Sequence, residues 1–476
     1  MGSEMCIRDR YILDSQIALR SWQQVPYAYY RKGSPYAKGL KKEEFELLRS
    51  CDGKREQEAD ELLETMAARG FIHPCKGEEN LTDWQKYRYC ENRYFPKVNW
   101  MITGKCNYNC LHCFNAADNA PSMSEWSLRE AEKFLDEARD CGVNAFTITG
   151  GEPMLHRNFM DILTGIYERG MYVEEINTNG YFLRQEVLDQ MKERGIRPLM
   201  KISFDGIGHH DWLRGRKGAE EDAIRAIRLC RTNDFPVMIQ TNVHRNNLDT
   251  LLETAKLMDS LGVWKMRIIR TSEAPRWKEN AGDAALGLTE YYDRMLEFAS
   301  AYMKTGCRMD VIIWQFLRLY PVTGSYGMIP VLYREKEYRD SLPVCKGVRG
   351  MVAVAANGNI FPCHQLSGTY ELNGDIPGNV KKESLRQLLS DSQYLCEVCT
   401  TVDKIQEHDR KCGNCKYFKY CAGGCRALAI VLTGDKLGAD PSKCVFFGQG
   451  YYEKTVRALR EYENYTEIAY NPGTDI

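Results

Sequence analysis

The sequence predicts an α/β protein with a partial (βα)6 barrel in the middle, a small module before it and a cysteine-rich domain after it. Three observations support this prediction. Short apolar runs alternate with amphipathic stretches through residues 97–305, residues 11–75 follow a different pattern, and nine of the 19 cysteines lie at or after Cys345. Strands that alternate with helices are typical of βαβ units around a parallel sheet.

The N-terminal module is expected to be winged-helix-like. Its elements read as strands at Tyr11–Trp22 and Val25–Lys32, helices at Lys41–Ser50 and Glu56–Arg69, and an extended segment from Gly70. A capping subdomain without a binding role is the alternative. Both helices are acid-rich and would repel phosphate, which disfavours DNA binding. Residues 1–10 are expected to be disordered or foreign to the fold, and residues 76–96 to bridge the module and the barrel.

The barrel itself is predicted over residues 97–305. Its strand candidates are apolar, as buried parallel strands should be: Val98–Thr103, Ala145–Thr149, Val173–Asn177, Met200–Phe204, Val237–Val243 and Met266–Ile269. Helix candidates between them include Leu128–Cys141, Glu186–Arg194, Ala219–Arg231 and Leu248–Leu261. Ligands in such sheets bind at the carboxyl ends of the strands.

After the barrel we expect a connecting region at 306–344, the cysteine-rich domain at 345–450, and a helix and tail at 451–476. The formal charge of −1 argues against broad nucleic-acid binding. No run approaches the ~18 apolar residues of a membrane span, and no secretory segment stands near the start. We therefore expect a cytoplasmic protein without membrane or nucleic-acid partners, whose cysteines bind metal rather than form disulfides.

Three cysteines directly after the first barrel strand form a C-x3-C-x2-C motif: Cys106, Cys110 and Cys113. Three thiolates can hold three irons of a [4Fe–4S] cluster and leave the fourth iron open, whereas electron carriers usually supply four cysteines. The motif resembles that of the radical S-adenosylmethionine (SAM) enzymes. The resemblance implies that the open iron binds SAM, which is cleaved to a 5′-deoxyadenosyl radical. His112 stands where the family often has an aromatic residue, so a packing role over adenine or, less well, a zinc-ligand role is open.

The resemblance extends to residues at the other strand ends. Gly150, Gly151, Glu152 and Pro153 resemble the motif whose backbone meets the SAM ammonium group. The resemblance further implies that Asn179 belongs to the SAM site and that Ser203 and Asp205 bind ribose. It also implies that Arg214 pairs with the SAM carboxylate and that Asn242 reaches the ribose or methionine moiety. Each of these residues taken alone reads as an ordinary cap or turn residue.

A second cysteine pattern resembles the seven-cysteine SPASM extension of some radical SAM enzymes. The resemblance implies two auxiliary clusters, one held by Cys412, Cys415, Cys421 and Cys444, the other by Cys345, Cys363 and Cys425. Zinc bound by the C-x2-C pairs is the alternative. Cys396 or Cys399 can supply a fourth ligand to the three-cysteine cluster; equally, that cluster can stay open and bind substrate sulfur.

His364 follows the second cysteine of this pattern, where sulfatase-maturing relatives carry an aspartate. It is a candidate proton-transfer group because the pKa of histidine lies near neutrality; a packing role is as well founded. Asp435 and Asp440, near the last cysteine, are further candidates for acid–base catalysis.

Residues Phe45–Lys54 and Gly70–Ile72 resemble the peptide-recognition domain of maturases of ribosomally made, post-translationally modified peptides (RiPPs), in which a leader peptide adds a strand to a sheet edge. The function implied is an anaerobic peptide maturase that installs a thioether or carbon–carbon crosslink. Its partners would be a precursor peptide and a flavodoxin- or ferredoxin-type reductant. The alternatives are a radical SAM oxidase of protein side chains or of cofactor biosynthesis, and a non-catalytic iron–sulfur or zinc scaffold.

Overall fold

The structure is a computed structural model, which describes residues 8–114, 124–271, 274–329, 339–345, 350–462 and 465–466. Its largest element is a twelve-stranded sheet in the order β18-β17-β8-β9-β10-β11-β12-β13-β14-β15-β16-β19. Seven consecutive strands of this sheet are parallel: β8 (Lys97–Thr103), β9 (Ala145–Gly150), β10 (Tyr172–Thr178), β11 (Leu199–Ser203), β12 (Val237–Val243), β13 (Lys265–Arg270) and β14 (Asp310–Ile313). The six predicted strands are thus present, within about one residue at either end.

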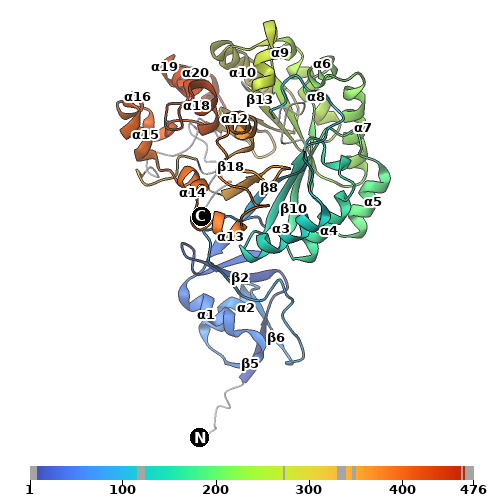
Figure 1. Cartoon of the computed structure of the whole chain (residues 1–476), viewed down its shortest axis with the longest axis vertical. Coiled ribbons are helices and arrows are strands. Elements are labelled where there is room, and N and C mark those ends of the chain that lie inside the picture. The colour runs from blue at the N-terminus through green and yellow to red at the C-terminus, as the bar shows by residue number, and fades with distance from the viewer. Residues whose placement is uncertain are drawn as a thin grey trace.

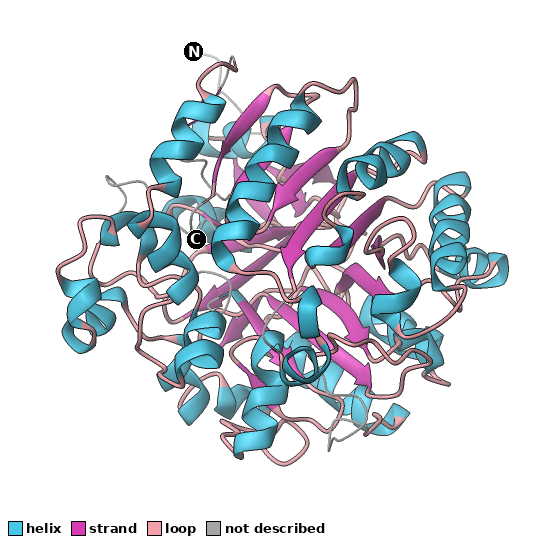
Figure 2. Ribbon diagram, turned by 90° about the horizontal axis from the view of Figure 1, so that it is seen from above, coloured by secondary structure: helices cyan, strands magenta, loops and turns pink. Residues whose placement is uncertain are grey.

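Helices cover the outer face of the curved sheet, as Figure 2 shows from above. They are α3 (Leu128–Asp140), α4 (Phe159–Glu168), α5 (Gln185–Glu193), α6 (His210–Arg214), α7 (Ala219–Thr232), α8 (Leu251–Ser260), α9 (Pro275–Asn280) and α10 (Leu288–Met303). Helix α3 begins at a capping box, in which Ser127 and Glu130 satisfy each other's backbone N–H groups. Its apolar side packs Phe134 against Trp100 of β8.

The predicted connecting region at 306–344 contains three strands of the large sheet: β14 and the antiparallel strands β15 (Leu317–Tyr320) and β16 (Ser325–Met328). Strand β14 pairs with β13, β15 with β14, and β16 with β15. Local sequence alone does not reveal such short strands, because pairing stabilises them. At the other end of the sheet, β17 (Met351–Val354) lies parallel to β8 and pairs with β18 (Ile360–Phe361). Strand β19 (Tyr465–Thr466) pairs with β16.

The N-terminal module lies below the barrel in Figure 1. It contains β1 (Arg8–Leu13), β2 (Ile17–Trp22), β3 (Ala28–Arg31), β4 (Lys38–Gly39), α1 (Lys42–Ser50), β5 (Asp52–Glu58), α2 (Glu61–Ala68), β6 (Ile72–Cys75) and β7 (Arg88–Cys90). These strands form two small sheets, ordered β5-β1-β6 and β4-β3-β2-β7.

Three predictions for this module were wrong in detail. Residues 8–10 belong to β1, so part of the segment expected to be disordered is a strand. Tyr11–Trp22 is divided between β1 and β2 by a turn in which the Ile17 N–H donates to the Asp14 carbonyl. Glu56–Arg69 is not one helix: β5 runs to Glu58, and the Asp60 carboxylate then caps α2 by accepting from the Leu63 N–H at 2.7 Å.

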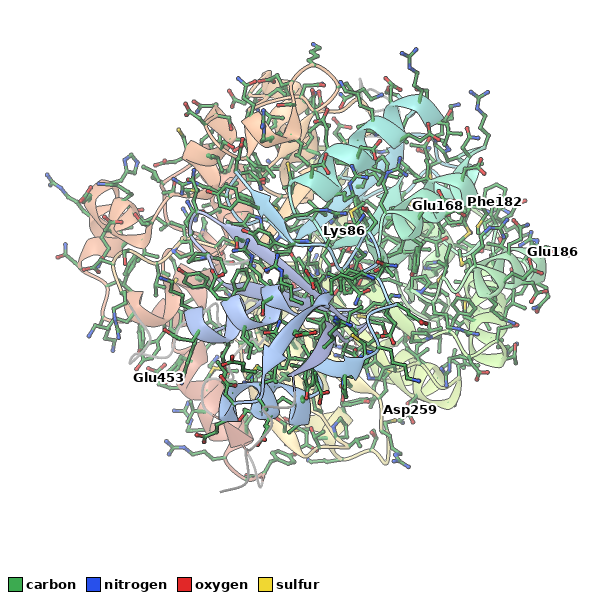
Figure 3. The ribbon with its side chains drawn as sticks, turned by 90° about the horizontal axis from the view of Figure 1, so that it is seen from below. Lys86, Glu168, Phe182, Glu186, Asp259 and Glu453 are labelled. Carbon is green, nitrogen blue, oxygen red and sulfur yellow. The ribbon has the colours of Figure 1, made fainter. Side chains whose placement is uncertain are left out.

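The module is fixed to the barrel by buried aromatic residues of its second sheet. The Trp22 indole donates to the Cys141 carbonyl at 3.2 Å, and the Tyr30 hydroxyl donates to the Gly142 carbonyl at 2.9 Å. A Cβ atom on Gly142 would lie 2.5 Å from the Trp22 ring, so only glycine fits here. Cys141 and Gly142 precede β9, and the contact therefore lies at the amino end of the parallel strands. In Figure 3, seen from below, the module stands in front of the barrel, with Lys86 of the bridge near the middle and Glu186 of α5 at the rim.

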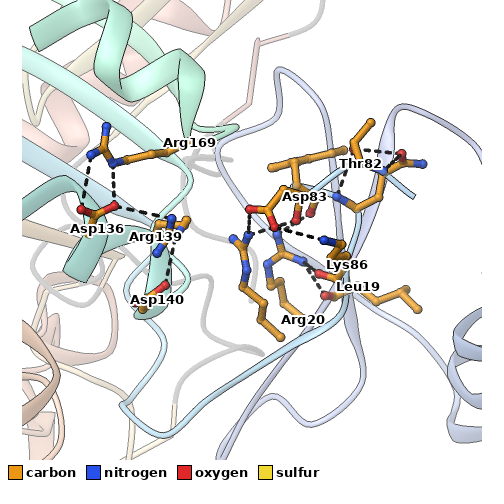
Figure 4. A network of polar contacts seen from close by, with 12 residues as sticks. Leu19, Arg20, Thr82, Asp83, Lys86, Asp136, Arg139, Asp140 and Arg169 are labelled. Carbon is orange, nitrogen blue, oxygen red and sulfur yellow. Dashed lines mark hydrogen bonds and ion pairs between the residues drawn. The ribbon is translucent and has the colours of Figure 1, made fainter. Parts of the chain in front are cut away.

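Polar networks lie on either side of this junction, one in the module and bridge and one in the barrel (Figure 4). The Arg20 guanidinium on β2 donates to the backbone carbonyls of Leu19, Lys86 and Trp84, and so ties the bridge segment to the module. Nearby, the Arg169 guanidinium binds the Asp136 carboxylate at 2.8 Å and joins α4 to α3.

The cysteine-rich domain is built from short helices that follow β17 and β18 in the chain. They are α12 (Ser367–Asn373), α13 (Leu385–Leu388), α14 (Gln393–Val398), α15 (Val402–His408), α16 (Arg410–Gly413), α17 (Phe418–Cys421), α18 (Arg426–Thr433) and α19 (Pro441–Gly448). The C-terminal helix α20 (Tyr451–Leu459) packs with α19 against α10. In the described part of the chain, no helix combines the length and apolar character that a bilayer span requires.

Candidate active site

The loop that carries Cys106, Cys110 and Cys113 leaves the carboxyl end of β8 and is held on two sides. On one side, the Gly151 N–H donates to the Thr103 carbonyl and the Glu152 N–H donates to the Lys105 carbonyl, both at 2.8 Å. A Cβ atom on Gly151 would lie 2.2 Å from the Lys105 oxygen, so the glycine permits this close approach. The sequence motifs after β8 and β9 are thus brought into direct backbone contact.

On the other side, the cysteine loop packs against the end of α6. The Leu111 N–H donates to the Leu213 carbonyl at 2.9 Å. Gly215 has φ +61°, and a Cβ atom there would lie 2.3 Å from the Asn109 carbonyl oxygen. Both the left-handed conformation and the lack of space require glycine.

The thiols of this loop are largely shielded from solvent. Burial raises the pKa of Cys106 to about 12, and the neighbouring Cys110 and Cys113 act in the same direction. Burial also raises the pKa of Cys110 to about 11, against the opposing effect of the Arg214 guanidinium. These sulfurs would remain protonated thiols without a cation, and metal binding would release their protons.

Glu152 has a structural task that the sequence motif does not reveal. Its fully buried carboxylate accepts from the Thr178 hydroxyl at 2.9 Å and from the Asn179 N–H at 2.8 Å, which joins the ends of β9 and β10. Burial raises the pKa of this carboxyl to about 7. Asn179 in turn donates from its amide to the Asn107 side chain at 2.8 Å, so it lies beside the cysteine loop.

Asp205 binds its neighbours at the strand ends. One carboxylate oxygen accepts from Arg214 Nε at 2.6 Å and lies 3.1 Å from His210 Nδ1, a ring nitrogen that accepts from the Asp205 N–H at 3.0 Å. The other oxygen accepts from the backbone and side-chain amides of Asn242. Three of the roughly four acceptor sites of the carboxylate thus receive hydrogen bonds from Arg214 and Asn242. Asp205 is fully buried and orients both residues; its contact with a ribose stays a prediction.

Arg214 lies where a bound carboxylate and the cluster would meet. Its Nη1 approaches the Cys110 thiol at 3.9 Å while its Nε is held by Asp205. Its remaining nitrogen, Nη2, has no hydrogen-bond partner among the described residues and remains available to a ligand. Ser203, at the end of β11, is partly exposed and likewise keeps its hydroxyl available within the described chain.

Several polar atoms around the loop are buried without a partner among the described residues: the Asn107 amide, the Tyr108 hydroxyl and His112 Nδ1. A polar ligand would satisfy them, so the residues present fit a bound cluster and SAM. No three histidine, cysteine or acidic side chains of the described chain are grouped to hold one metal ion. A cluster separates its thiolates by its own iron and sulfide atoms, so the two observations are compatible.

Sequence reasoning missed four polar residues of this region. His210 and Asn247 support Asp205, the latter by donating to the Asp205 and Asn242 carbonyls. Arg267 on β13 stacks on Trp314 at 3.8 Å and has its Nε buried without a partner. Asn107 lies in the sequence between the motif residues Cys106 and Cys110. The sequence around each of these residues shows no distinctive motif. Their roles follow only from the residues that lie next to them in the fold.

Several motif cysteines of the cysteine-rich domain affect one another's pKa. Burial raises the pKa of Cys412 to about 12, and the neighbouring Cys444 and Cys415 act in the same direction. Burial likewise raises the pKa of Cys363 to about 12, with effects of Cys425 and Cys345 in the same direction. The division of the seven cysteines between two clusters stays a prediction.

The candidate acid–base residues lie in different surroundings. His364 is buried, with its Nε2 at 3.0 Å from the Asn99 carbonyl of β8, and burial lowers its pKa to about 4. It is therefore neutral near pH 7, with a free lone pair on Nδ1. Asp435 is exposed, pairs with His408 at 2.8 Å and accepts from the Leu437 N–H, which is a turn-stabilising arrangement. Asp440 is buried and caps α19.

Comparisons with known proteins agree with this arrangement. Residues 100–258 match the family model of the Radical SAM superfamily. The chain is 28% identical to an AdoMet-dependent heme synthase of Methanosarcina barkeri, over 73% of this chain and 96% of that protein. It is 25% identical to a PqqA peptide cyclase of Granulibacter bethesdensis, over 75% and 89% of the two chains.

Among solved structures, Streptococcus suis SuiB bound to its precursor peptide SuiA is similar with a TM-score of 0.63, at 14% identity, over 91% of this chain and 99% of SuiB. The structure of anSMEcpe with bound AdoMet is similar with a TM-score of 0.57, at 16% identity, over 78% and 97% of the two chains. At these identities the likeness concerns the fold. Residues 8–75 make up more than 9% of the chain, so the SuiB match includes part of the N-terminal module.

Proposed function

Because the chain is a radical SAM enzyme, we propose that it carries out a net oxidation at an unactivated carbon of a ribosomally made precursor peptide. When bound, SAM and the reduced cluster supply a 5′-deoxyadenosyl radical that takes a hydrogen atom from such a carbon. The product class we favour is a thioether or carbon–carbon crosslink. The cofactors provide this chemistry. The protein binds and orients the substrate and excludes water from the site.

Different residues at the strand ends would bind the cluster, the SAM carboxylate and the ribose. Cys106, Cys110 and Cys113 would hold the cluster. The free Nη2 of Arg214 would meet the SAM carboxylate, and Ser203 a ribose hydroxyl. Asp205 fixes the guanidinium so that it does not have to be ordered when SAM binds, which preserves binding energy.

The observation that carries the peptide proposal is the N-terminal module and its open sheet edges. Strands β5 and β6 are the outer strands of the β5-β1-β6 sheet. An extended peptide can add a strand to such an edge by backbone hydrogen bonds. β6 contains Pro74, which has no N–H to donate, so β5 is the better edge for a leader. SuiB, a protein of similar fold, is known in a structure with its precursor peptide SuiA bound.

Cofactor biosynthesis is the second candidate. The heme synthases and an Fe-coproporphyrin III synthase match 72–75% of this chain. The unpartnered Nε of Arg267 fits a substrate carboxylate, a group that porphyrin side chains and acidic peptides both have.

The test is anaerobic coexpression with a candidate precursor peptide encoded beside this gene, followed by mass spectrometry. A loss of about two hydrogens per site, the balance of a net two-electron oxidation, supports the peptide maturase. An unchanged mass, together with loss of carboxyl groups from an iron porphyrin carboxylate in the same preparation, would favour cofactor biosynthesis. Absence of 5′-deoxyadenosine from the reduced, reconstituted protein would contradict both and leave the non-catalytic scaffold.

A further inference from the structure

The cysteine-rich domain contains a cavity of about 300 Å³ whose walls include four thiols: Cys345, Cys363, Cys396 and Cys425. Three of them are the set assigned to one auxiliary cluster, and the fourth comes from α14. The cavity is far larger than the ~30 Å³ of a single water molecule. Four thiols around one space of this size match the ligand number of a fully ligated [4Fe–4S] cluster.

The neighbouring Cys399 is in a different position. Although it is three residues further along the chain, it is absent from the walls of this cavity. Its sulfur accepts from the Arg93 guanidinium at 3.6 Å, on the side of the bridge segment. The two cysteines of this C-x2-C pair therefore face different surroundings.

The charged residues around the cavity suit an anionic cluster. Arg426, which is 8% exposed, lines the cavity, and its Nε is buried without a hydrogen-bond partner in the described structure. Lys436 also lines it. Among the described residues of the wall, Glu397 is the one carboxylate, and it is bound by Lys436 at 2.7 Å and by the Tyr370 hydroxyl at 2.8 Å. An orphaned guanidinium N–H can donate to a thiolate or sulfide.

We infer that Cys396, and not Cys399, is the fourth ligand of the auxiliary cluster held by Cys345, Cys363 and Cys425. The Cys396 thiol would lose its proton to solvent, and its sulfur would bind the remaining iron. Every iron of this cluster then has a protein ligand. The cluster serves to pass electrons and has no open iron at which to bind a substrate thiol. This inference rests on the auxiliary clusters of the proposed function.

The experiment starts from full-length protein in which Cys106, Cys110 and Cys113 are replaced by alanine, which leaves the two auxiliary clusters as the only iron centres. Cys396→Ala and the matched control Cys399→Ala are made in this background and reconstituted anaerobically. Mössbauer and electron paramagnetic resonance spectra are recorded before and after mild oxidation. An iron that lacks a protein ligand is lost first, which yields a three-iron cluster.

The expected result is that Cys396→Ala converts one of its two clusters, half of the cluster population, to the three-iron form. Cys399→Ala and the parent should keep both clusters intact. The unchanged spectrum of the second cluster, held by Cys412 and its partners, serves as the control for folding. Adding a small thiol to Cys396→Ala should prevent the conversion by occupying the open iron.

Three outcomes would overturn the inference. In the first, Cys396→Ala keeps both auxiliary clusters intact, as the background protein with alanine at Cys106, Cys110 and Cys113 does. In the second, Cys399→Ala forms the three-iron cluster instead of Cys396→Ala, and in the third, the background protein itself loses an iron from one cluster. The last result means that the cluster is open despite Cys396. A fourth outcome is that the background protein binds no auxiliary cluster under any reconstitution condition. That result would refute both this inference and the oxidative role proposed above, which distinguishes it from the other three outcomes.

Discussion

The contact between Gly151 and the cysteine loop gives a sharp test of how the SAM site is built. In Gly151→Ala, the new Cβ would lie 2.2 Å from the Lys105 oxygen and 2.6 Å from the Gly104 oxygen, both backbone atoms. An ordinary contact begins near 3.4 Å, so the loop must retreat by about 1 Å. The retreat strains the hydrogen bonds from the Gly151 and Glu152 N–H groups.

The expected cost is about 1–3 kcal/mol in stability, as for other overpacked sites. The effect on chemistry should be larger, because a misplacement of about 1 Å can lower a rate on the order of 10²-fold. We expect Gly151→Ala to lose or loosen only the SAM-binding cluster, and to produce 5′-deoxyadenosine at a rate reduced by that factor. Iron content, cluster spectra with and without SAM, and timed product analysis measure these effects.

Gly287→Ala is the matched control. Gly287 has φ −63°, and a Cβ atom there would meet no atom within 4 Å. It should behave as the parent protein. The reasoning would be refuted if Gly151→Ala bound its full complement of iron, gave the same spectral change with SAM, and cleaved SAM at the parental rate.

Three further predictions concern other parts of the molecule. Asp205→Asn removes the charge that orients Arg214, and the SAM dissociation constant should rise about tenfold or more; an unchanged constant in equilibrium dialysis would contradict the role assigned to Asp205. Trp22→Ala should cost about 3–5 kcal/mol and release the N-terminal module to limited proteolysis, whereas equal resistance would contradict the anchoring role. Burial lowers the pKa of His244 from 6.5 to about 4, so the unfolded chain binds this proton more readily. Stability in urea should therefore fall between pH 6.5 and 4, by about 3 kcal/mol at most, and His244→Gln should flatten that slope.

The sequence predicts the barrel strands well because each contains buried apolar residues, such as Val237, Ile239 and Val243 of β12, and needs little context. Strand β5 escaped prediction because its residues, Asp52–Glu58, are mostly polar and exposed, and it owes its conformation to pairing with β1. Short strands such as β14 depend on non-local pairing in the same way.

For the candidate site, spacing in the chain predicts the cysteine ligands and Arg214, and the structure brings Arg214 next to Cys110. Spacing could not predict that the Glu152 and Asp205 carboxylates bind groups at neighbouring strand ends, because these hydrogen bonds join residues distant in sequence. The pairing of Asp435 with His408 is likewise invisible in the sequence, and a catalytic role for Asp435 stays a prediction.

The position of the N-terminal module has a consequence for the architecture of a substrate. The module contacts Cys141 and Gly142 at the amino end of the strands, whereas the cysteine loop leaves the carboxyl end of β8. Strand β8 has seven residues, so the two ends are separated by roughly 23 Å. Under the proposed function, a peptide held by the module would have to cover this distance before a side chain reaches the radical, which takes about seven extended residues. The proposal therefore predicts a spacer of at least that length between the recognised segment and the modified residue. Shortening this spacer should abolish modification while leaving binding intact.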